Sequence, residues 1–188
     1  MRRKFDIPED ALVGVFVATN WRRKGLWPLL DAMAILTHRH TARPFYLIVV
    51  GRGPRLRAYI RAWRLHISPY LRLVGHQPSE VYYGASDLVL LPTYFDPCPL
   101  VVVEGMACGL PVITTVHAGS HEVLPDQGGC VLADPEDTEQ MADYIESFMD
   151  TARLQNASRA ALVAARPYTC EREHRRILNL MMSVSQET

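Results

Sequence analysis

The chain has 188 residues, of which 48% are hydrophobic and 21% are charged, which is ordinary for a globular domain and excludes disordered and collagen-like classes. Its 20 basic and 20 acidic residues cancel, so no whole-molecule field draws it to nucleic acid or to an anionic membrane, although a local basic cluster could still matter. No apolar run approaches the roughly 18 residues that a membrane span needs, and the basic N-terminus lacks the apolar core of a signal peptide.

Short apolar runs alternate with longer amphipathic stretches along the whole chain. The apolar runs predict six strands, and the stretches between and after them predict helices. The strands are expected at residues 13–19, 45–51, 71–75, 87–93, 111–115 and 129–134. The helices are expected at 26–39, 54–65, 79–85, 99–108, 138–150, 152–166 and 169–184, with Pro167 between the last two. This alternation indicates a doubly wound, Rossmann-like α/β fold, with a parallel sheet of about six strands covered on both faces.

The segment FDPCPLVVVEGMACGLPVI, residues 95–113, contains a run of valines that could be a strand ended by Glu104. Pro99 and Gly109 instead provide start and stop signals for a helix joining two parallel strands. Such a helix is apolar nearly all round, which predicts that it is buried. A lone carboxylate in a mostly buried helix is costly unless it is hydrogen-bonded, and a ligand could supply that bond.

Ligands of doubly wound sheets sit outside the carboxyl ends of the strands. In this chain that edge is formed by four loops, NWRRKG (20–25), GRGP (51–54), GHQPSE (75–80) and TYFDPCP (93–99). Arg22, Arg23 and Lys24 crowd the positive end of the following helix, which is either a solvated basic turn or an anion site.

The other loops offer weaker signals of the same kind. The glycines of GRGP could cradle a phosphate or form a simple turn, and Asp96 could bind a ligand or cap the next helix. Backbone N–H groups of Leu100 and Val101 form a second anion cradle at that helix N-terminus. Arg23 and Lys24, the cradle at residues 100–101 and the two carboxylates together describe a pocket that holds a diphosphate and hydrogen-bonds several hydroxyls. A nucleotide sugar has those groups.

The four cysteines are irregularly spaced, and Cys98 and Cys108 lie in apolar segments typical of buried thiols. We therefore expect reduced thiols and a cytoplasmic protein. His117 and His121 lie four residues apart, but the segment contains Gly119 and lacks a third ligand, which argues against a metal site.

Residues 93–115, TYFDPCPLVVVEGMACGLPVITT, resemble the Glu-x7-Glu signature of retaining GT-B glycosyltransferases of the family-four type. Here the pair is Asp96 and Glu104, and the shorter first carboxylate puts the identity of the sugar in doubt more than the reaction. The likeness covers roughly residues 10–150, and among members of the family the NWRRKG loop and TYFDPCP are most similar to lipopolysaccharide core glucosyltransferases that use UDP-glucose. Four further segments agree in order and spacing: VFVATNWRRKG, FYLIVVGRGP, LRLVGHQPSEVYYGASDLVLLPT and AGSHEVLPDQGGCVLADPED.

The resemblance implies roles for individual residues. Arg23 and Lys24 would hold the donor diphosphate and stabilise the charge that grows on it as it leaves. Asp96 would take hydroxyls of the donor sugar. These three residues are the expected catalytic set. Glu104 would take the ribose hydroxyls. The full donor-binding set is Gly51, Arg52, His76, Gln77, Asp96, Pro99, Leu100, Val101 and Glu104, with His76 and Gln77 beside the base. No cofactor or divalent metal is implied.

The resemblance also implies a domain organisation. Residues 1–12 would be the linker, 13–168 the nucleotide-sugar-binding domain, and 169–188 a helix that in the family returns to an N-terminal acceptor-binding domain. We expect the chain to bind donor, to transfer little or no sugar by itself, and to self-associate or sit beside an acceptor-domain chain through this helix. A peripheral position at the inner membrane face is left open for the full-length enzyme.

Two alternatives stay open from the sequence alone. The chain could belong to a GT-B epimerase or phosphorylase, or it could be a non-catalytic nucleotide-sugar-binding module that acts with a separate partner chain. The basic loop together with the pair of Asp96 and Glu104 favours a transferase over the first alternative. Transfer to a saccharide or glycolipid acceptor is the expected reaction, with no nucleic-acid partner.

Overall fold

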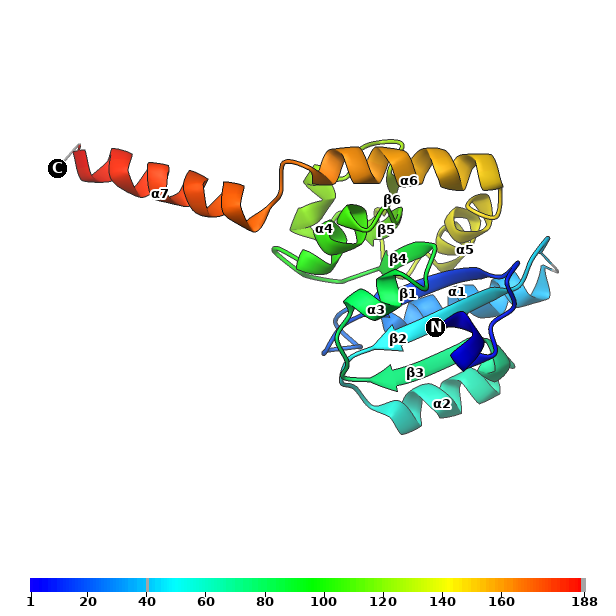
Figure 1. The fold of residues 1–188 in the computed structure, drawn as a ribbon. Helices are drawn as coiled ribbons and strands as arrows, with labels where there is room; N and C mark the ends of the chain where they lie inside the picture. The colour runs from blue at the N-terminus through cyan, green and yellow to red at the C-terminus, as the bar shows by residue number, and fades with distance from the viewer. Residues whose placement is uncertain (40, 187–188) are drawn as a thin grey trace.

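The fold is built on one parallel sheet of six strands (Figure 1). The computed structural model describes residues 1–39 and 41–186. The strands are β1 (Leu12–Val17), β2 (Phe45–Val50), β3 (Leu71–Gly75), β4 (Leu88–Leu91), β5 (Val112–Thr115) and β6 (Gly129–Leu132). All six strands that the apolar runs predict are confirmed. β1, β2, β4 and β5 are buried along almost their whole length, as expected for strands covered on both faces.

The strand order is β3-β2-β1-β4-β5-β6. The chain runs outward from β1 to β3 and then returns to the other side of β1, so the direction of winding reverses between β1 and β4. β1 pairs with β2 in register from Leu12 and Phe45 to Val17 and Val50, whereas β1 and β4 share only two paired positions. A doubly wound sheet binds its ligands at such a reversal.

The helices cover both faces of the sheet. They are α1 (Leu26–His38), α2 (Arg55–Arg64), α3 (Glu80–Tyr83), α4 (Leu100–Ala107), α5 (Thr138–Ser147), α6 (Thr151–Ala165) and α7 (Cys170–Gln186), with short 3-10 helices η1 (Arg2–Phe5), η2 (Ser68–Tyr70) and η3 (Gly119–Val123). α1 packs against α2 and α5, and α4 packs against α6. The seven predicted helices are thus present, and the doubly wound class is confirmed.

Two expectations about α4 are wrong. The helix is not buried all round, since only Val102, Gly105 and Met106 are buried while the Leu100 side chain is 65% exposed. Cys98 and Cys108 are exposed rather than buried. The physical reason is that α4 contacts the sheet and α6 on one side only, so an apolar sequence here does not imply apolar neighbours on every face.

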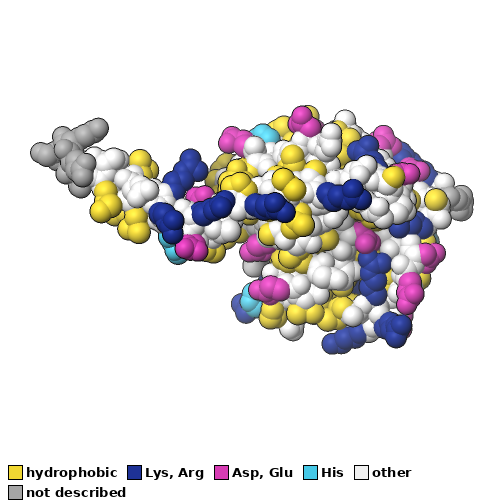
Figure 2. All heavy atoms as spheres, turned by 45° about the horizontal axis from the view of Figure 1, so that its top comes forward, with side chains coloured by type: hydrophobic (Ala, Val, Ile, Leu, Met, Phe, Trp, Pro, Cys, Tyr) yellow, Lys and Arg dark blue, Asp and Glu magenta, His cyan; other side chains and the backbone are white. Residues whose placement is uncertain are grey.

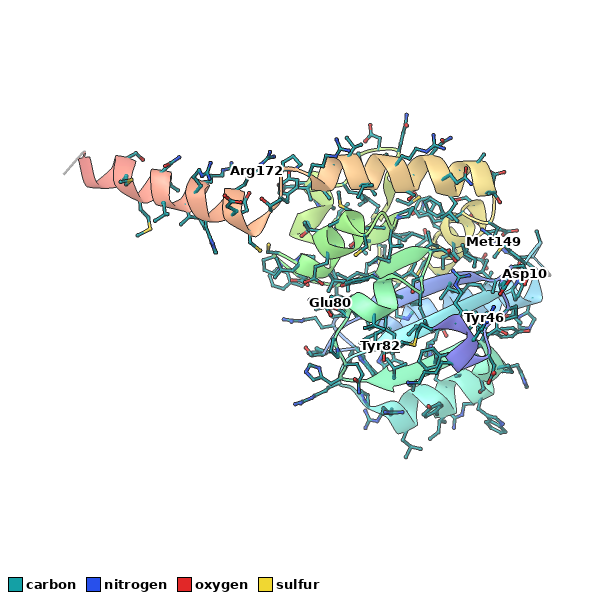
Figure 3. All side chains as sticks on the ribbon, viewed as in Figure 1. Asp10, Tyr46, Glu80, Tyr82, Met149 and Arg172 are labelled. Atoms are coloured by element: carbon teal, nitrogen blue, oxygen red, sulfur yellow. The ribbon has the colours of Figure 1, made fainter. Side chains whose placement is uncertain are left out.

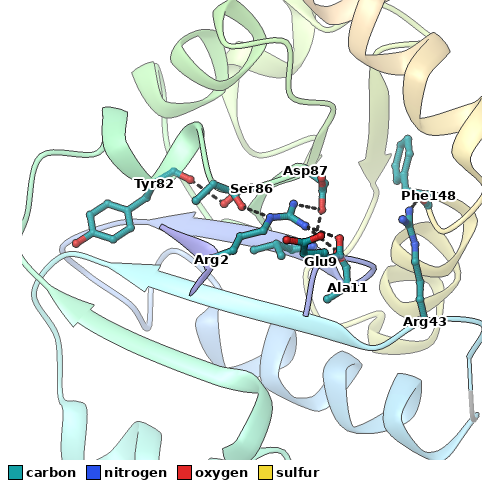
Figure 4. A network of polar contacts seen from close by, with 10 residues as sticks. Arg2, Glu9, Ala11, Arg43, Tyr82, Ser86, Asp87 and Phe148 are labelled. Atoms are coloured by element: carbon teal, nitrogen blue, oxygen red, sulfur yellow. Dashed lines mark hydrogen bonds and ion pairs between the residues drawn. The ribbon is translucent and has the colours of Figure 1, made fainter. Parts of the chain in front are cut away.

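The segment before β1 is fixed to the start of β4 (Figure 4). The Arg2 side chain donates a hydrogen bond to the Ala85 carbonyl at 2.9 Å and pairs with Asp87 at 2.7 Å. Asp87 also accepts a hydrogen bond from the Val13 N–H at 2.8 Å. One carboxylate therefore joins η1, β1 and β4.

The last helix, α7, extends away from the rest of the molecule (Figures 1 and 2). Apolar side chains are exposed along it, including Ile177, Leu178, Leu180 and Met181. Within the described residues, none of the helices combines the length and the apolar character needed to cross a bilayer.

Candidate functional site

The four loops singled out in the sequence follow the carboxyl ends of β1, β2, β3 and β4, and so lie at one edge of the sheet. The loop after β1 and the loop after β4 flank the point where the winding reverses. Topology therefore brings residues 20–25 and 92–99 together, although about seventy positions separate them in the chain.

The basic loop 20–25 is anchored by its backbone and its tryptophan. The Trp21 side chain is buried, and its Nε1–H donates to the Ala18 carbonyl at 3.1 Å. Gly25 adopts φ 81°, and a Cβ there would collide with the Pro92 carbonyl. Only glycine suits that backbone and that close approach. The anchoring leaves Arg22 and Arg23 exposed at the loop surface.

Two hydrogen bonds tie the basic loop to the loop after β4. The Arg23 carbonyl accepts from the Tyr94 N–H at 2.9 Å and from the Thr93 hydroxyl at 3.1 Å. Among the described residues, the Arg23 guanidinium itself makes no ion pair or hydrogen bond. Its backbone is thus held while its charge stays available to an incoming anion.

Lys24 and Asp96 form an ion pair across the two loops. Their side chains are only 12% and 15% exposed, so the pair is largely removed from water. Asp96 does not cap α4, because no side chain caps that helix. The sequence analysis placed Lys24 on phosphate and Asp96 on a sugar, and the structure shows that the two groups also contact each other. The Lys24 ammonium has three N–H donors, of which two remain for a ligand.

The backbone of Asp96 is also held by the segment after β5. Its N–H donates to the His117 carbonyl at 3.0 Å, and its carbonyl accepts from the Gly119 N–H at 2.8 Å. A Cβ on Gly119 would collide with the Pro97 carbonyl, so glycine is required where the two segments approach. These bonds fix the backbone of Asp96 and therefore the place of its carboxylate beside Lys24.

The N-terminus of α4 offers free backbone donors beside this pair. Pro99 is the N-cap residue, one position earlier than the first helical position expected for it, and it has no side-chain acceptor. The N–H groups of Leu100 and Val101 precede the first intrahelical hydrogen bond and point out of the helix end, where the helix dipole favours negative charge.

Glu104 lies one turn farther along α4, and it is exposed, contrary to the expectation of a carboxylate in a buried helix. Its Oε2 accepts a 2.7 Å hydrogen bond from the hydroxyl of Tyr83 on α3. The hydrogen bond that the sequence analysis required is therefore supplied, at least in part, by the protein. Burial, and next the Glu104 carboxylate, raise the pKa of Tyr83 well above its usual value. Tyr83 thus remains a neutral donor that orients Glu104.

The glycine loop after β2 packs against the basic loop. Gly51 adopts φ 117° and donates its N–H to the Gly75 carbonyl at 2.6 Å. A Cβ on Gly53 would collide with the Trp21 indole, so these glycines permit close packing of adjacent loops. The Arg52 side chain is exposed above this contact.

His76 and Gln77 follow β3 at the same edge of the sheet, and both are exposed. Glu80 and Tyr82 of the neighbouring α3 lie in front of the sheet (Figure 3). The structure thus places all the predicted site residues along one edge, with Arg23, Lys24, Asp96 and the α4 N-terminus at its centre. Their roles toward a ligand remain predictions.

A hollow of about 460 Å³, which the sequence did not predict, lies next to the basic loop and is lined by Asn20, Arg22, Arg23, Tyr94 and Glu136. The Tyr94 hydroxyl hydrogen-bonds to Glu136, which follows β6. Burial and this carboxylate raise the pKa of Tyr94 above its usual value. Glu136 lies in the resembling segment 118–137, but nothing in the spacing predicted its contact with Tyr94.

No group of three His, Cys, Asp or Glu side chains that could hold a metal ion occurs within the part of the chain that the structure describes. A donor site without a metal remains a prediction of the sequence. The positive charges near the anion cradle come from Arg22, Arg23 and Lys24.

A doubly wound parallel sheet, with a basic loop and an uncapped helix N-terminus at its winding reversal, defines a Rossmann-like α/β architecture. The family model described as "Glycosyl transferases group 1" matches residues 11–151, well over half of the chain. The chain therefore belongs to this glycosyltransferase family, as the resemblance predicted.

Individual relatives agree with this assignment. The D-inositol 3-phosphate glycosyltransferase of Corynebacterium kroppenstedtii is 30% identical over 159 residues, which cover 79% of this chain and 35% of the relative. The lipopolysaccharide glucosyltransferase WaaG of Escherichia coli is 28% identical over 160 residues, covering 83% and 42%. A crystal structure of WaaG matches with a TM-score of 0.79 at 26% identity, over 89% of this chain and 46% of that one.

The same fold occurs in HepE of Anabaena, crystallised in complex with UDP-glucose. It matches with a TM-score of 0.85 at 20% identity, over 97% of this chain and 51% of HepE. The chain spans less than half the length of the curated relatives it matches. These likenesses establish the GT-B half-domain architecture.

Proposed function

We propose that this chain is the donor-binding half of a retaining glycosyltransferase that transfers a hexose, glucose being favoured, from a UDP-sugar to a saccharide or glycolipid acceptor. The observation that carries the proposal is the juxtaposition of the Lys24–Asp96 pair with the Arg23 guanidinium and the uncapped α4 N-terminus at the winding reversal. The names of two neighbours support it, since WaaG is a glucosyltransferase and HepE was crystallised with UDP-glucose.

In this proposal the diphosphate lies between the basic loop and the N-terminus of α4. Arg23 and the two spare N–H donors of Lys24 contact its oxygens on one side, and the N–H groups of Leu100 and Val101 contact them on the other. As the glycosidic bond to phosphate breaks, negative charge grows on the leaving diphosphate, and these prearranged donors stabilise it.

The carboxylates are assigned to hydroxyl groups. Glu104, oriented by Tyr83, accepts from the ribose hydroxyls through its remaining lone pairs. Asp96 accepts from hydroxyls of the donor sugar while it stays paired with Lys24, which couples sugar recognition to phosphate binding. His76 and Gln77 flank the base from the β3 side, and Gly51 and Arg52 complete the edge between them and the basic loop.

The acceptor is bound outside the described site, by an N-terminal acceptor-binding domain or chain, and we place the reaction in the cytoplasm. The exposed apolar side of α7, with Ile177, Leu178 and Met181, is the surface proposed to contact that domain or a second copy of this chain. Sedimentation equilibrium of the chain alone and of an Ile177→Ser variant tests this contact. An unchanged monomer in both samples rejects self-association through α7.

Calorimetric titration against UDP-glucose, UDP-galactose, GDP-mannose and ADP-glucose tests the donor. We expect UDP-glucose to bind most tightly, and Arg23→Gln to weaken it while Arg3→Gln, a matched change on exposed η1, does not. Preference for a guanine or adenine nucleotide would overturn the choice of UDP. Binding of no nucleotide sugar would overturn the donor site itself.

Turnover separates the transferase from a pure binding module. We expect UDP release to require both an acceptor and the acceptor-binding domain. Binding of UDP-glucose without any release of UDP, even when that domain and an acceptor are added, would favour the non-catalytic alternative.

A further inference from the structure

Helix α2 presents its large apolar side chains to solvent and its small ones to the protein. Only Ala58 and Ala62 of the helix are buried, whereas Leu56 and Trp63 are 72% and 73% exposed. A helix of a globular protein ordinarily turns its large apolar residues inward. Figure 3 shows side chains of α2 projecting away from the sheet at the lower edge of the molecule.

The exposed apolar residues of α2 form a single stripe, which consists of Leu56, Tyr59, Ile60 and Trp63. At about 100° per residue these positions fall within one third of the helix circumference. Arg57 and Arg64 border the stripe on one side, and Arg55 borders it on the other. An aromatic and aliphatic stripe between arginines is the pattern of helices that lie in a membrane interface.

The sequence segment that contains α2 is one-sided in charge, although the chain as a whole is formally neutral. Between Asp31 and Glu80 the sequence contains eight arginines and no Asp or Glu. The other segments therefore carry 12 basic and 20 acidic residues. Arg39 is one of the eight arginines, and it pairs with carboxylates of α5. α2 itself contains four arginines and no acidic residue, which favours its approach to a negatively charged surface.

Two of the four arginines of α2 are unpaired in the described part of the chain, whereas Arg55 donates a hydrogen bond to the Leu73 carbonyl at 3.0 Å. Among the described residues, the Arg57 and Arg64 side chains have no hydrogen bond or ion pair, whereas Arg61 pairs with Asp31 of α1. The Nε of Arg61 is buried and has no partner. The cluster thus has spare donors for anionic oxygens beyond what the protein satisfies.

A hollow of about 510 Å³ lies beside the stripe, between α1 and α2, and combines both chemistries. Its lining is half basic and half apolar: Arg57, Arg61 and Arg64 with Trp27, Ile60 and Leu65. An amphiphile with an anionic head and a hydrocarbon tail satisfies both sets of groups at once.

We propose that α2 is a peripheral membrane-binding surface that docks on bilayers containing anionic lipids. The stripe inserts at the level of the headgroups, and Arg57 and Arg64 contact the lipid phosphates. This surface is separate from the donor edge, but α2 begins at Arg55, directly after the loop of Gly51 and Arg52. The donor edge would therefore face acceptors at the bilayer surface, a consequence that rests on the proposed function.

Sedimentation with vesicles tests the surface. The 188-residue chain should bind vesicles of phosphatidylcholine with about 30% phosphatidylglycerol and should bind pure phosphatidylcholine at least tenfold more weakly. Raising the salt from about 0.1 M to 1 M should weaken binding in the same way. Equal binding to both kinds of vesicle, or no binding to either, would overturn the proposal.

Two double variants test the apolar stripe and the arginines of α2 separately. Arg57→Gln with Arg64→Gln should weaken binding to the anionic vesicles by about 30-fold, since each cation near the surface contributes about fivefold. Leu56→Ser with Trp63→Ser should weaken it by about tenfold or more. Undiminished binding by both variants would assign the membrane contact to another part of the chain and reject α2.

Matched controls come from the exposed side of α6. Leu162→Ser with Val163→Ser, and Arg159→Gln with Arg166→Gln, make the same changes at exposed positions and should leave vesicle binding within about twofold. Circular dichroism melts establish that all four variants fold. A titration with single-stranded RNA supplies the remaining outcome, because α2-dependent binding of RNA without binding of vesicles would identify a nucleic-acid surface and refute the lipid proposal. The vesicle measurements and the nucleotide-sugar titration are independent, so the membrane proposal can fail without the proposed donor site failing.

Discussion

The ion pair between Lys24 and Asp96 makes a quantitative prediction about the free energy of unfolding. Both side chains are less than a fifth exposed, so each charge has lost most of its hydration and depends on the other. Removing one partner of a fully buried pair costs about 3–5 kcal/mol. Because this pair lies at an open edge of the sheet, we expect about 2 kcal/mol for either single change.

Lys24→Met and Asp96→Asn are suitable substitutions, since they remove the charges and keep most of the volume. In a double-mutant cycle the two losses should not add, and the double variant should lose about 2 kcal/mol rather than about 4, a coupling of about 2 kcal/mol. Urea unfolding followed by circular dichroism measures the free energies, and the melting temperature should fall by about 4–8 °C in each single variant. Losses that add to within about 0.5 kcal/mol would refute the coupling.

The same substitution separates a structural role of Lys24 from a role in binding. A charge-assisted contact to phosphate is worth about 1.5–3 kcal/mol, so Lys24→Met should weaken UDP-glucose by about 10- to 100-fold and uridine by less than about twofold. The only other lysine of the chain, Lys4, is exposed on η1, and Lys4→Met is the matched control. Equal losses for UDP-glucose and uridine would show that the lysine does not contact the diphosphate.

Three further predictions follow from neighbouring contacts. Glu104→Gln should lower UDP affinity by about tenfold with an unchanged melting temperature, whereas unfolding without any change in ligand binding would mark the residue as structural. Because the pKa of Tyr83 is raised in the folded state, the unfolded chain loses the phenol proton at lower pH, and the stability should fall as the pH rises above the ordinary tyrosine value of 10.0. Tyr83→Phe should show a smaller fall in melting temperature between neutral and alkaline pH. An equal fall in the variant and the parent chain would show that Tyr83 does not cause it. Gly53→Ala should displace the Trp21 indole and cost about 1–3 kcal/mol by chemical denaturation, while an unaltered stability would show that the loop can yield.

The sequence predicted the architecture because each strand and helix is specified by residues within it or directly beside it. Each strand is a short apolar run, and Pro99 and Gly109 mark the ends of α4 closely, with Pro99 at the N-cap and Gly109 in the left-handed conformation just past the helix. The expectation that α4 is buried was wrong for a reason that is not local. Burial depends on which elements surround a helix, and the composition of residues 100–107 does not contain that information.

The site was predicted as a set of residues and not as a set of contacts. Lys24 and Asp96 are 72 positions apart, and Tyr83 and Glu104 are 21 apart. Both contacts arise because β1 lies beside β4 and because α3 lies near α4, which only the strand order reveals. The carboxylates were recognisable from their motif, but their protein partners required the three-dimensional arrangement.

The attachment of the donor loops has a consequence for the kinetics of ligand binding. The loop after β1 is bonded to the loop after β4 through the Arg23 carbonyl, and the loop after β4 is bonded to the segment after β5 through Asp96. Apart from the Thr93 hydroxyl, main-chain groups make these bonds, so we expect the loops that flank the proposed anion site to keep the same shape when a ligand binds. Little ordering entropy then opposes association. We expect UDP to associate in a single phase whose rate is set by diffusion and charge, without a slower step in which loops reorganise.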